Sequence, residues 1–375
     1  MRIAHVIDSM DIGGAEIMVQ SLCHQHRAEG HEVSVHCLFS CGILGETLQE
    51  QGFDVVTHGP ASYPRLIARL ARSFLTLRPD VVHCHNVVAS VIGAVSGRFA
   101  RAKSIICTRH GIVSRPRNYR RQGLFWLAAR CADRVVAVCP KAEANLARAT
   151  FAQPWKLVTI WNGAKPASVS GPGAAEPPSE SKHAFNIVTV ARLGPPKDHA
   201  TLVRALSKVR QVAPAVRLWI VGDGPMKSQL QRLAADLDCA ENVTFLGARS
   251  DVGDWLARSH LFVLSSISEG VPISLLEAMA AGLPSVVTDV GGMGDVVMRA
   301  DAGHAVPPGD VDAMAEAIVA YQSDPAFRQR HAENARRGYE RYFSFERMAS
   351  AYMFLYQDPR QPLQRNSALE RTDTA

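Results

Sequence analysis

The 375-residue sequence lacks the features that would place it in several special classes of protein. No apolar run approaches the roughly 18 residues that a membrane-spanning helix requires. With 47% apolar residues, 20% charged residues, 27 Gly and 21 Pro, the composition excludes disordered and fibrous chains. The N-terminal MRIAHVIDSMD becomes acidic at Asp8, so it predicts no secretory signal, and we expect a cytoplasmic protein.

Two chemical signatures are also missing. The eight cysteines are scattered without a C-x-x-C pair, which favours reduced cysteines packed as small apolar residues in a reducing compartment. The dinucleotide fingerprint G-x-G-x-x-G is absent, because GDGP at 222–225 lacks the third glycine and GGMG at 291–294 has the wrong spacing. We therefore expect no NAD site.

Positive charge is present but unevenly distributed. Residues 1–165 contain 20 Lys and Arg against 11 Asp and Glu, whereas residues 166–375 contain 21 against 24. The formal net charge of +6 thus combines +9 in the first part with −3 in the second. A basic excess confined to one half points to a partner that carries negative charge.

Short apolar runs alternate with segments of helical period along most of the chain. Runs that are apolar on both faces and are separated by helices are typical of a parallel sheet covered on both sides. We predict strands at IAHVID, EVSVHCLF, FDVVTHG, VVHCHN, SIICTRH, RVVAVCP and LVTIWNG in the first half, and at NIVTVARLG, VRLWIVGDGP, NVTFLG, HLFVLSS, PSVVTDVGG and GHAVPP in the second.

The domain boundaries follow from the break in this pattern. Residues 166–184 are rich in Pro, Gly, Ser and Ala without periodicity, which indicates a linker. We predict one α/β domain over 1–165, a second over 185–345, and a terminal helix within 346–375 that packs back on the first domain before a frayed tail. Parallel sheets bind ligands at the carboxyl ends of their strands, so two facing domains predict a cleft site.

The densest chemical signal is SEGVPISLLEAMAAGLP at 268–284, which follows a predicted strand. Glu269 then lies in the loop at the strand's carboxyl end, Gly270 lets a ligand approach the backbone, and Pro272 fits the first turn of an anion-attracting helix. Glu277 lies within that helix, and carboxylates suit neighbouring sugar hydroxyls. Taken singly, Glu269 is equally an acid at a helix start and Glu277 a solvated surface residue.

A second signal, ARLGPPKDH at 191–199, follows the first strand after the linker. Arg192 and Lys197 lie five residues apart in a strand-to-helix loop, where a guanidinium and an ammonium can together hold a diphosphate. The alternative is a pair of solvated loop cations with Asp198 as a helix N-cap. The position at the carboxyl end of a strand favours the diphosphate site.

Strand ends in the first half carry further candidates. Gly13 and Gly14 lie between the first predicted strand and helix, where they permit close backbone approach to phosphate or sugar. His110 ends a strand and precedes a basic loop, which suits either a ligand contact or a histidine satisfied by backbone. His83 and His85 also end a strand, but no acidic or cysteine cluster accompanies them, so we do not assign them as metal ligands.

Taken together, these segments resemble the retaining glycosyltransferases of family 4, whose GT-B architecture comprises two Rossmann-like, doubly wound parallel-sheet domains facing across a cleft. The resemblance covers nearly the whole chain, and its most specific element is an E-x7-E motif, matched by Glu269 and Glu277. The supporting motifs, in chain order, are GGAE at Gly13, HG at His110, NG at Asn162, Arg192 with Lys197, GDGP at Gly222, FLG at Phe245–Gly247 and TDVGG at Thr288.

The resemblance implies a role for each matching residue. Arg192 and Lys197 would neutralise the donor's diphosphate, and Glu277 would bind the ribose hydroxyls. Glu269 would hold hydroxyls of the transferred sugar, which His110 would also contact, and Phe245–Arg249 would meet the base through backbone. We thus predict His110, Arg192, Lys197 and Glu269 as catalytic, and as further donor-binding residues Gly13, Gly14, Asn162, Gly222, Phe245, Gly247, Gly270, Val271, Pro272, Ile273 and Glu277.

The sequence gives no reason to expect a metal or a cofactor. D-x-D sequences, which hold Mg²⁺ in many sugar-nucleotide enzymes, occur at Asp236–Asp238 and Asp310–Asp312. The first is predicted to end a helix and Asp310 to cap one, and neither lies beside the predicted cleft. Arg192, Lys197 and helix termini would neutralise the phosphates instead, so we predict a metal-independent enzyme.

The implied reaction moves a hexose or N-acetylhexosamine from a nucleoside-diphosphate sugar, with UDP the expected nucleotide, to a hydroxyl of a glycan or lipid-linked acceptor. It would retain the anomeric configuration and serve the synthesis of cell-surface polysaccharide or glycolipid. Because no spare acid is identifiable as a nucleophile, stabilisation of the leaving group would carry the catalysis. The alternatives are an epimerase or phosphorylase of the same fold, or a catalytically silent glycan-binding scaffold.

The basic residues of the first half form two clusters. Arg65, Arg69 and Arg72 share one helix face at i, i+4 and i+7. The loop after His110 contains Arg115, Arg117, Arg120 and Arg121. No nucleic-acid recognition motif accompanies them. We predict an acceptor that carries phosphate, or peripheral binding to the anionic inner face of the plasma membrane, with a solvated basic face as the alternative.

Overall fold

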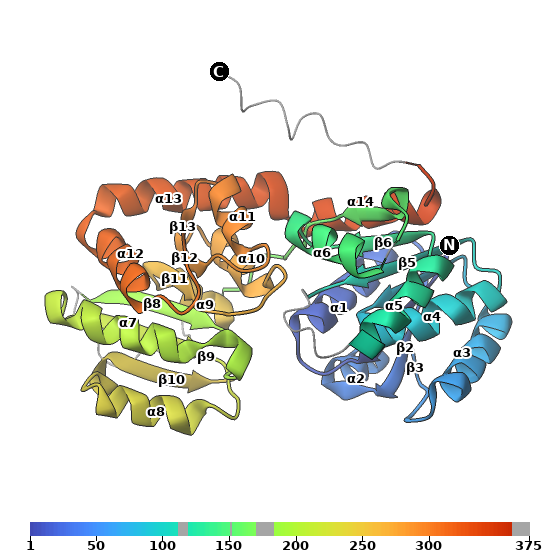
Figure 1. The fold of residues 1–375 in the computed structure, drawn as a ribbon, viewed down its shortest axis with the longest axis horizontal. Coiled ribbons are helices and arrows are strands. Elements are labelled where there is room, and N and C mark those ends of the chain that lie inside the picture. Colours follow the sequence, from blue (N-terminus) through green and yellow to red (C-terminus); the bar gives the residue numbers. More distant parts are fainter. Residues whose placement is uncertain (112–118, 151, 170–183, 362–375) are drawn as a thin grey trace, which may run out of the picture. The chain divides into compact units, whose positions relative to one another are not determined.

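The computed structural model describes residues 1–111, 119–150, 152–169 and 184–361. The chain forms two compact units, Met1–Trp161 together with the C-terminal segment from Glu346, and Asn162–Phe345. Each unit contains one parallel sheet with helices packed on it (Figure 1). The predicted α/β class with two parallel-sheet domains is confirmed. The passage between units lies at Trp161, and residues 170–183 of the predicted linker lie outside the described residues.

The first unit contains a seven-stranded sheet. In spatial order its strands are β3 (Asp54–Thr57), β2 (Glu32–Ser40), β1 (Arg2–Ser9), β4 (Val81–His85), β5 (Ser104–Arg109), β6 (Arg134–Ala137) and β7 (Leu157–Thr159). The helices are α1 (Gly14–Ala28), α2 (Gly42–Glu50), α3 (Tyr63–Leu77), α4 (Val87–Phe99), α5 (Tyr119–Cys131), α6 (Pro140–Thr150), the short η2 (Pro154–Lys156) and α14 (Phe345–Gln357). The order of strands reverses between β1 and β4, which makes that pair the switch point of the sheet.

The second unit repeats this plan with six strands. In spatial order they are β10 (Val243–Gly247), β9 (Val216–Val221), β8 (Phe185–Val190), β11 (Leu261–Leu264), β12 (Ser285–Thr288) and β13 (Gly303–Val306). The helices are η3 (Pro195–Lys197), α7 (His199–Val212), α8 (Lys227–Asp236), η4 (Ala240–Asn242), α9 (Val252–Ala257), α10 (Ile273–Ala280), α11 (Met293–Arg299), α12 (Val311–Ser323), α13 (Pro325–Gly338) and the π-helical turn η5 (Tyr339–Phe343). Here the switch point lies between β8 and β11.

Burial follows the hydrophobic patterns that predicted these elements. In β4, the successive residues Val81 and Val82 are both buried, as expected for a strand with helices on both faces of its sheet. In α3, Leu66, Leu70 and Phe74 form a buried stripe at four-residue spacing, which leaves the opposite face of the helix to solvent. The strand period and the helix period thus each place their apolar residues against the core.

The C-terminal helix α14 belongs to the first unit through polar contacts with its sheet. The hydroxyl of Tyr356 lies 2.6 Å from Nδ1 of His83, and the hydroxyl of Tyr352 lies 3.1 Å from Oγ1 of Thr108. After the helix, the guanidinium of Arg134 donates to backbone carbonyls between residues 359 and 361. These contacts attach the end of the described chain to β4, β5 and β6.

Candidate functional site

The loops that follow β8 and β11 are joined by an ion pair. Nζ of Lys197, the last residue of η3, contacts Oε1 of Glu269, five residues beyond β11. The two side chains are 26% and 13% exposed, so the pair is partly shielded from water. It lies at the carboxyl ends of the two strands that flank the switch point, which is where parallel sheets bind ligands.

Two serines that follow β11 form hydrogen bonds with this pair and its backbone. Oγ of Ser266 donates to Oε1 of Glu269 at 3.1 Å. Oγ of Ser265 lies 3.1 and 2.8 Å from the carbonyl oxygens of Lys197 and Asp198. Neither serine is among the residues predicted from the sequence, although two polar residues at the end of an otherwise apolar strand were the available signal.

Asp198 occupies the N-cap position of α7 but does not cap it with its side chain. Its φ is 43°, and its carboxylate accepts from the hydroxyl of Thr201 at 2.6 Å, with no bond to a backbone N–H of the helix. The following His199 is buried, which lowers its pKa to about 4 with a smaller contribution from the charge of Lys197. The cation at Lys197 therefore has a neutral imidazole close by in sequence.

Arg192 lies in a loop that packs tightly against the loop after β9. The N–H of Leu193 donates to the carbonyl of Asp223 at 2.9 Å. At Gly222, where φ is +138°, a Cβ atom would lie 2.0 Å from the carbonyl oxygen of Ala191. Backbone packing therefore requires Gly222. The side chain of Arg192 is exposed, and no described carboxylate forms an ion pair with it.

The backbone of the SEGVP segment is held in place by hydrogen bonds. The carbonyl of Gly270 accepts from the N–H of Gly292 at 2.8 Å, and the carbonyl of Val271 accepts from Nδ2 of Asn162 at 2.8 Å. Asn162 is only 5% exposed, and its Oδ1 has no partner among the described residues. Asn162, predicted to bind the donor, thus supports the loop that carries other predicted donor-binding residues.

Helix α10 begins one residue later than predicted. Pro272 occupies the N-cap position with ψ of 134°, so it precedes the first turn, which starts at Ile273. Its fixed φ still directs the chain into the helix. No side chain caps this end, and the first four N–H groups of a helix have no intrahelical acceptor, so the end can accept an anion.

Glu277 lies on α10 and is partly shielded from water. Burial raises its pKa from 4.5 to about 7. No described residue forms an ion pair or hydrogen bond with its carboxylate. The group therefore differs from Glu269, whose carboxylate is paired, and the solvated-surface alternative for Glu277 does not hold. A buried carboxyl that lacks a partner can accept hydrogen bonds from the hydroxyls of a ligand.

The remaining predicted residues of this unit contribute backbone. The side chain of Phe245 packs against the core of the unit. Gly247 has φ of +71°, and its carbonyl accepts from the N–H of Gly222 at 2.8 Å. Gly247 can therefore offer a ligand only its main chain.

In the first unit, Gly13 and Gly14 open helix α1 beside a group of carboxylates. A Cβ atom on Gly13 would lie 2.3 Å from Oε2 of Glu16. The pKa of Glu16 is raised, mainly by burial and further by the charges of Asp8 and Asp11. Repulsion from these acids opposes phosphate at this loop, so hydroxyl groups are the more suitable ligand here.

His110 follows β5 and contacts another imidazole. Its Nε2 lies 3.2 Å from Nδ1 of His85, and burial lowers its pKa to about 4. Nδ1 of His110 is buried without a hydrogen-bond partner in the described part of the chain. The histidine satisfied by backbone, our alternative for this residue, is therefore not what the structure contains.

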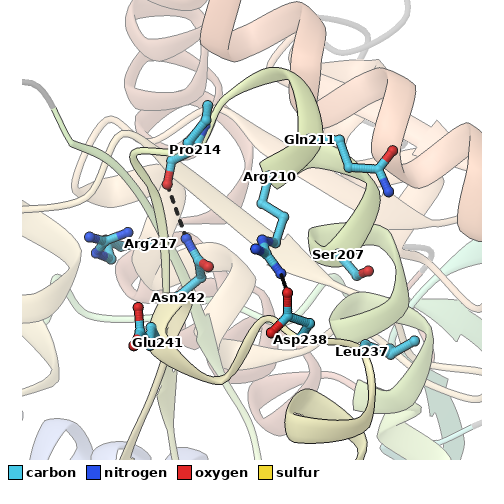
Figure 2. A pocket seen from close by; sticks show the side chains of 9 residues that line it. All are labelled: Ser207, Arg210, Gln211, Pro214, Arg217, Leu237, Asp238, Glu241 and Asn242. Carbon is cyan, nitrogen blue, oxygen red and sulfur yellow. Dashed lines mark hydrogen bonds and ion pairs between the residues drawn. The ribbon is translucent and has the colours of Figure 1, made fainter.

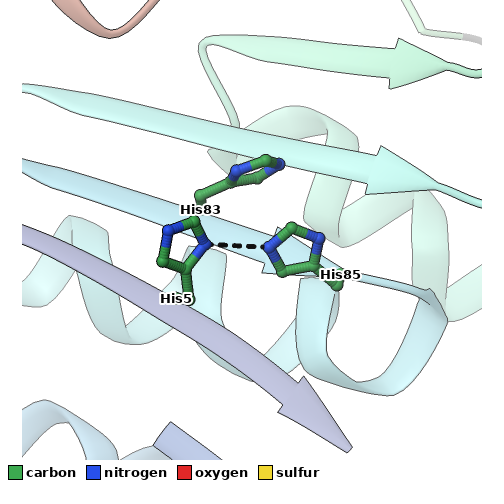
Figure 3. Close-up of side chains that lie close together, drawn as sticks. All are labelled: His5, His83 and His85. Carbon is green, nitrogen blue, oxygen red and sulfur yellow. Dashed lines mark hydrogen bonds between the residues drawn. The ribbon is translucent and has the colours of Figure 1, made fainter. Parts of the chain in front are cut away.

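Among the described residues, His5, His83 and His85 form a group that could hold a metal, since one nitrogen of each lies within 4.8 Å of the others (Figure 3). Each nitrogen already has a partner, however. The nitrogens of His83 bond to Tyr356 and Thr108, and those of His5 and His85 bond to other imidazoles. A metal would have to break these bonds, so we do not assign one.

The two D-x-D segments are occupied by structural contacts. Asp236 ends α8 and Asp238 pairs with Arg210 at 3.3 Å. Asp310 caps α12 by accepting from the N–H of Ala313 at 2.9 Å, as predicted, and Asp312 pairs with Lys208. None of these carboxylates forms an ion pair with Lys197, which pairs with Glu269.

The basic face of α3 is present, whereas the arginine side chains of the basic loop after His110 lie outside the described residues. Arg65, Arg69 and Arg72 are exposed on α3. Arg115 and Arg117 lie outside the described residues, as do the side chains of Arg120 and Arg121. Within the described ranges, no helix has the length and apolar composition needed to cross a bilayer.

A surface cavity of about 510 Å³ lies elsewhere in the second unit (Figure 2). Its lining includes Pro214 and Arg217, at the start of β9, and the Arg210–Asp238 pair. The cavity therefore lies at the amino ends of the strands. The Lys197–Glu269 pair lies at the carboxyl ends, which is the edge where parallel sheets bind ligands.

Two family models match the chain. The one described as Glycosyltransferase Family 4 matches residues 12–168, and the one described as Glycosyl transferases group 1 matches residues 176–338. Each match includes most of the strands of one sheet, together with the loops at their carboxyl ends.

Characterised proteins and solved structures resemble the chain as well. The UDP-Gal:alpha-D-GlcNAc-diphosphoundecaprenol alpha-1,3-galactosyltransferase of Escherichia coli is 27% identical over 65% of this chain and 67% of that protein. The N-acetyl-alpha-D-glucosaminyl L-malate synthase of Bacillus anthracis is 33% identical over 42% of this chain and 41% of that protein. Anabaena HepE, solved in complex with UDP, has a TM-score of 0.82 at 22% identity, covering 95% of this chain and 100% of that one.

The buried carboxyl of Glu277 predicts a pH-dependent stability. Because its folded-state pKa exceeds its ordinary value, its stabilising contribution is complete below about pH 4.5 and is lost as pH rises through about 7. Glu277→Gln stays neutral, so its free energy of unfolding should exceed that of the wild type by an amount that grows to about 3 kcal/mol between these two pH limits. Denaturant unfolding at a series of pH values measures this difference. Glu316→Gln, at an exposed position of α12, is the control, and parallel curves for wild type and Glu277→Gln would refute the prediction.

Proposed function

The chain belongs to the family 4 glycosyltransferases and has their GT-B fold, and on this basis we propose that it transfers a hexose or N-acetylhexosamine from a UDP-sugar. Two relatives support the choice of nucleotide: the E. coli enzyme is named for UDP-Gal, and Anabaena HepE was solved with UDP. The donor occupies the carboxyl edge of the second sheet. The observation that carries this proposal is the Lys197–Glu269 pair at the switch point between β8 and β11.

The diphosphate is bound by positive charge from three sources. Arg192 supplies a guanidinium that no described carboxylate neutralises, Lys197 supplies an ammonium, and α10 supplies free N–H groups at its uncapped end. Negative charge accumulates on the leaving diphosphate as the sugar departs. Positive groups positioned beside the diphosphate stabilise that charge, which lowers the barrier.

The two glutamates divide the hydroxyls of the donor between them. Glu269, held by Lys197 and Ser266, accepts hydrogen bonds from the transferred sugar. Glu277, which has no described partner, accepts them from the ribose. A bound ribose thereby supplies the hydrogen bonds that this buried carboxylate lacks, so nucleotide binding and ionisation of Glu277 favour each other.

We also propose that the reaction retains the anomeric configuration and needs no metal. The carboxylate of Glu269 is engaged by an ammonium and a hydroxyl, which lowers its reactivity as a nucleophile and favours departure and attack on one face of the sugar. Of the carboxylates in the D-x-D segments, that of Asp310 caps a helix and those of Asp238 and Asp312 form ion pairs, so the cations and α10 take over the neutralisation of phosphate.

The acceptor in this proposal is a glycan or lipid-linked hydroxyl, and the protein acts in the cytoplasm, at the inner face of the plasma membrane. The name of the E. coli relative specifies a sugar-diphosphoundecaprenol acceptor. An acceptor of this kind carries phosphates next to a membrane. The exposed arginines of α3 provide the charge to bind either the phosphates or anionic lipid.

Nucleotide binding is tested by thermal unfolding with UDP, GDP, ADP or NAD. We expect UDP to raise the melting temperature, because a ligand at about 100 times its Kd adds about 2.7 kcal/mol to the free energy of unfolding. The shift should be smaller in Glu277→Gln than in the wild type. A shift with NAD alone would contradict the proposal, and a shift with GDP or ADP would correct the choice of base.

Substitution of the cations tests the diphosphate site. We expect Arg192→Ala and Lys197→Ala each to lower kcat/KM by two or more orders of magnitude, the scale of one lost preorganised charge contact. Turnover of a UDP-sugar, with the product's linkage and anomeric configuration read by NMR, measures both the rate and retention. Lys208→Ala removes a lysine that pairs with Asp312 in the same unit and is the control. Unchanged turnover in the Arg192 or Lys197 variant would rule out that residue's role.

Flotation of the full chain with vesicles tests the basic face of α3. Binding to phosphatidylglycerol vesicles at low salt should exceed binding to phosphatidylcholine vesicles. It should fall about a hundredfold when Arg65, Arg69 and Arg72 are all changed to Gln, at about 1 kcal/mol per charge. A control variant carries Arg→Gln at Arg204, Arg232 and Arg337, which are exposed in the second unit. Equal loss in both variants, or no binding by the wild type, would exclude the membrane interaction.

A further inference from the structure

Four histidines of the first unit are joined in a continuous line of ring-to-ring hydrogen bonds. Nε2 of His110 lies 3.2 Å from Nδ1 of His85, Nε2 of His85 lies 3.1 Å from Nδ1 of His5, and Nε2 of His5 lies 3.5 Å from Nδ1 of His26. Figure 3 shows the middle link between β1 and β4. We call these four residues the histidine chain. It runs from the end of β5 across the switch point of the sheet to α1.

Every link of the histidine chain joins an Nε2 to an Nδ1, and this couples the four tautomers. A neutral imidazole has one N–H donor and one acceptor nitrogen. If His85 donates from Nδ1 to His110, its Nε2 must accept from Nδ1 of His5, and the same choice passes to His26. Only two arrangements therefore satisfy all three links. In one all four rings carry the proton on Nδ1, and in the other all carry it on Nε2.

The two ends of the histidine chain differ in their access to solvent, which distinguishes these arrangements. Nε2 of His26 and Nδ1 of His110 are both buried atoms without a hydrogen-bond partner in the described residues. The residue His26 is fully buried, whereas His110 is partly exposed. With Nδ1–H throughout, the unpaired donor lies on His110, the partly exposed residue at the carboxyl end of β5. With Nε2–H throughout, it lies on the fully buried His26, and an unpaired donor in a fully buried residue is the costlier outcome.

The surroundings keep the four rings neutral. Burial is the main cause that lowers the pKa of each ring, to about 4 for His26 and His110, and the neighbouring histidines lower the values for His5 and His85 further. A protonated His85 or His5 would donate from both nitrogens, so one of its two links would lose its acceptor. His83 lies beside the chain but bonds to Tyr356 and Thr108, so it leaves the three links intact.

We propose that the histidine chain holds His110 as a neutral imidazole with its proton on Nδ1, so that His110 presents an N–H donor to an oxygen of the ligand. His85, His5 and His26 act as positioning residues, because they set the tautomer and the ring plane of His110 without touching the ligand. The ligand group is an acceptor oxygen, such as a sugar hydroxyl. The identity of the ligand rests on the proposed function, whereas the tautomer does not.

Imidazole nitrogen NMR of the full chain labelled with ¹⁵N-histidine tests the tautomer in the absence of any ligand. We expect four rings with a protonated Nδ1 and an unprotonated Nε2 at neutral pH, identified through single substitutions. Four rings protonated on Nε2, mixed tautomers within the chain, or a charged ring would each overturn the proposal.

Propagation along the chain is tested two links away from His110. In His5→Phe both nitrogens are lost, so His110 should change to a mixture of tautomers. In His5→Gln the amide can still accept on one side and donate on the other, so the Nδ1–H form of His110 should persist. His26→Phe removes the buried end of the histidine chain and should also produce a mixture of His110 tautomers. This variant provides the same test if His5→Phe does not fold. His36→Phe is the control, because His36 is a buried histidine bonded to His58 and Ser34. If the tautomer of His110 is unchanged in both His5→Phe and His26→Phe, only His85 can influence it, and propagation along the histidine chain is refuted.

Kinetics separate this inference from the proposed function. His85→Phe should raise KM for the UDP-sugar or lower kcat/KM about fivefold to tenfold, the scale of one neutral hydrogen bond, and His36→Phe should not. If no nucleoside-diphosphate sugar is turned over or bound by the wild type, the proposed function fails while the NMR result still decides the tautomer. If the sugar is turned over and His85→Phe behaves as His36→Phe does, the positioning role fails and the proposed function stands.

Discussion

Parallel pairing of the strands is the constraint on which both candidate regions depend. Every pair in the two sheets is parallel, so each strand ends at the same edge as its neighbours and each return helix lies across a face. Where the strand order reverses, the two loops on either side diverge and leave side chains accessible. In the second unit that point brings Lys197 to Glu269, and in the first it brings His5 to His85. The chemistry of each region thus follows from a topological property of its sheet.

The charged groups of the loops after β8 and β11 and of α10 differ in their partners. Arg192 is exposed, Lys197 and Glu269 pair with each other, and Glu277 is partly buried, with a pKa raised to about 7. An anion is attracted by the exposed cation, whereas a hydroxyl-rich group is needed to compensate the acid that has no described partner. A ligand that combines a diphosphate with ribose and sugar hydroxyls meets both requirements, which is why a nucleotide-sugar fits this site better than a simple phosphate.

Glycines and amides give the second site its rigidity. Gly222 allows the loop after β9 to touch the loop that carries Arg192, and Gly291, with φ of +60°, allows the loop after β12 to approach the carbonyl of Glu269, where a Cβ atom would lie 2.1 Å away. Gly292 and Asn162 then bond to the next two carbonyls along the chain. Gly222 and Asn162, both predicted to bind the donor, therefore fix the loops around the site. The position of these loops determines where charges and N–H groups point.

The sequence by itself determined the elements, because hydrophobic period and strand-end position are local properties: each predicted strand is present, Asp310 caps α12, and Glu269 follows β11. It also determined the family, through the E-x7-E spacing of Glu269 and Glu277 and the order of the supporting motifs. Tertiary structure alone decided which side chains meet. The pairing of Lys197 with Glu269, the partial shielding of Glu277 from water and the line from His110 to His26 join residues from separate elements, 21 to 80 residues apart along the chain for the imidazole links and the ion pair. Contacts of that kind depend on the order and register of the strands, which no local pattern encodes.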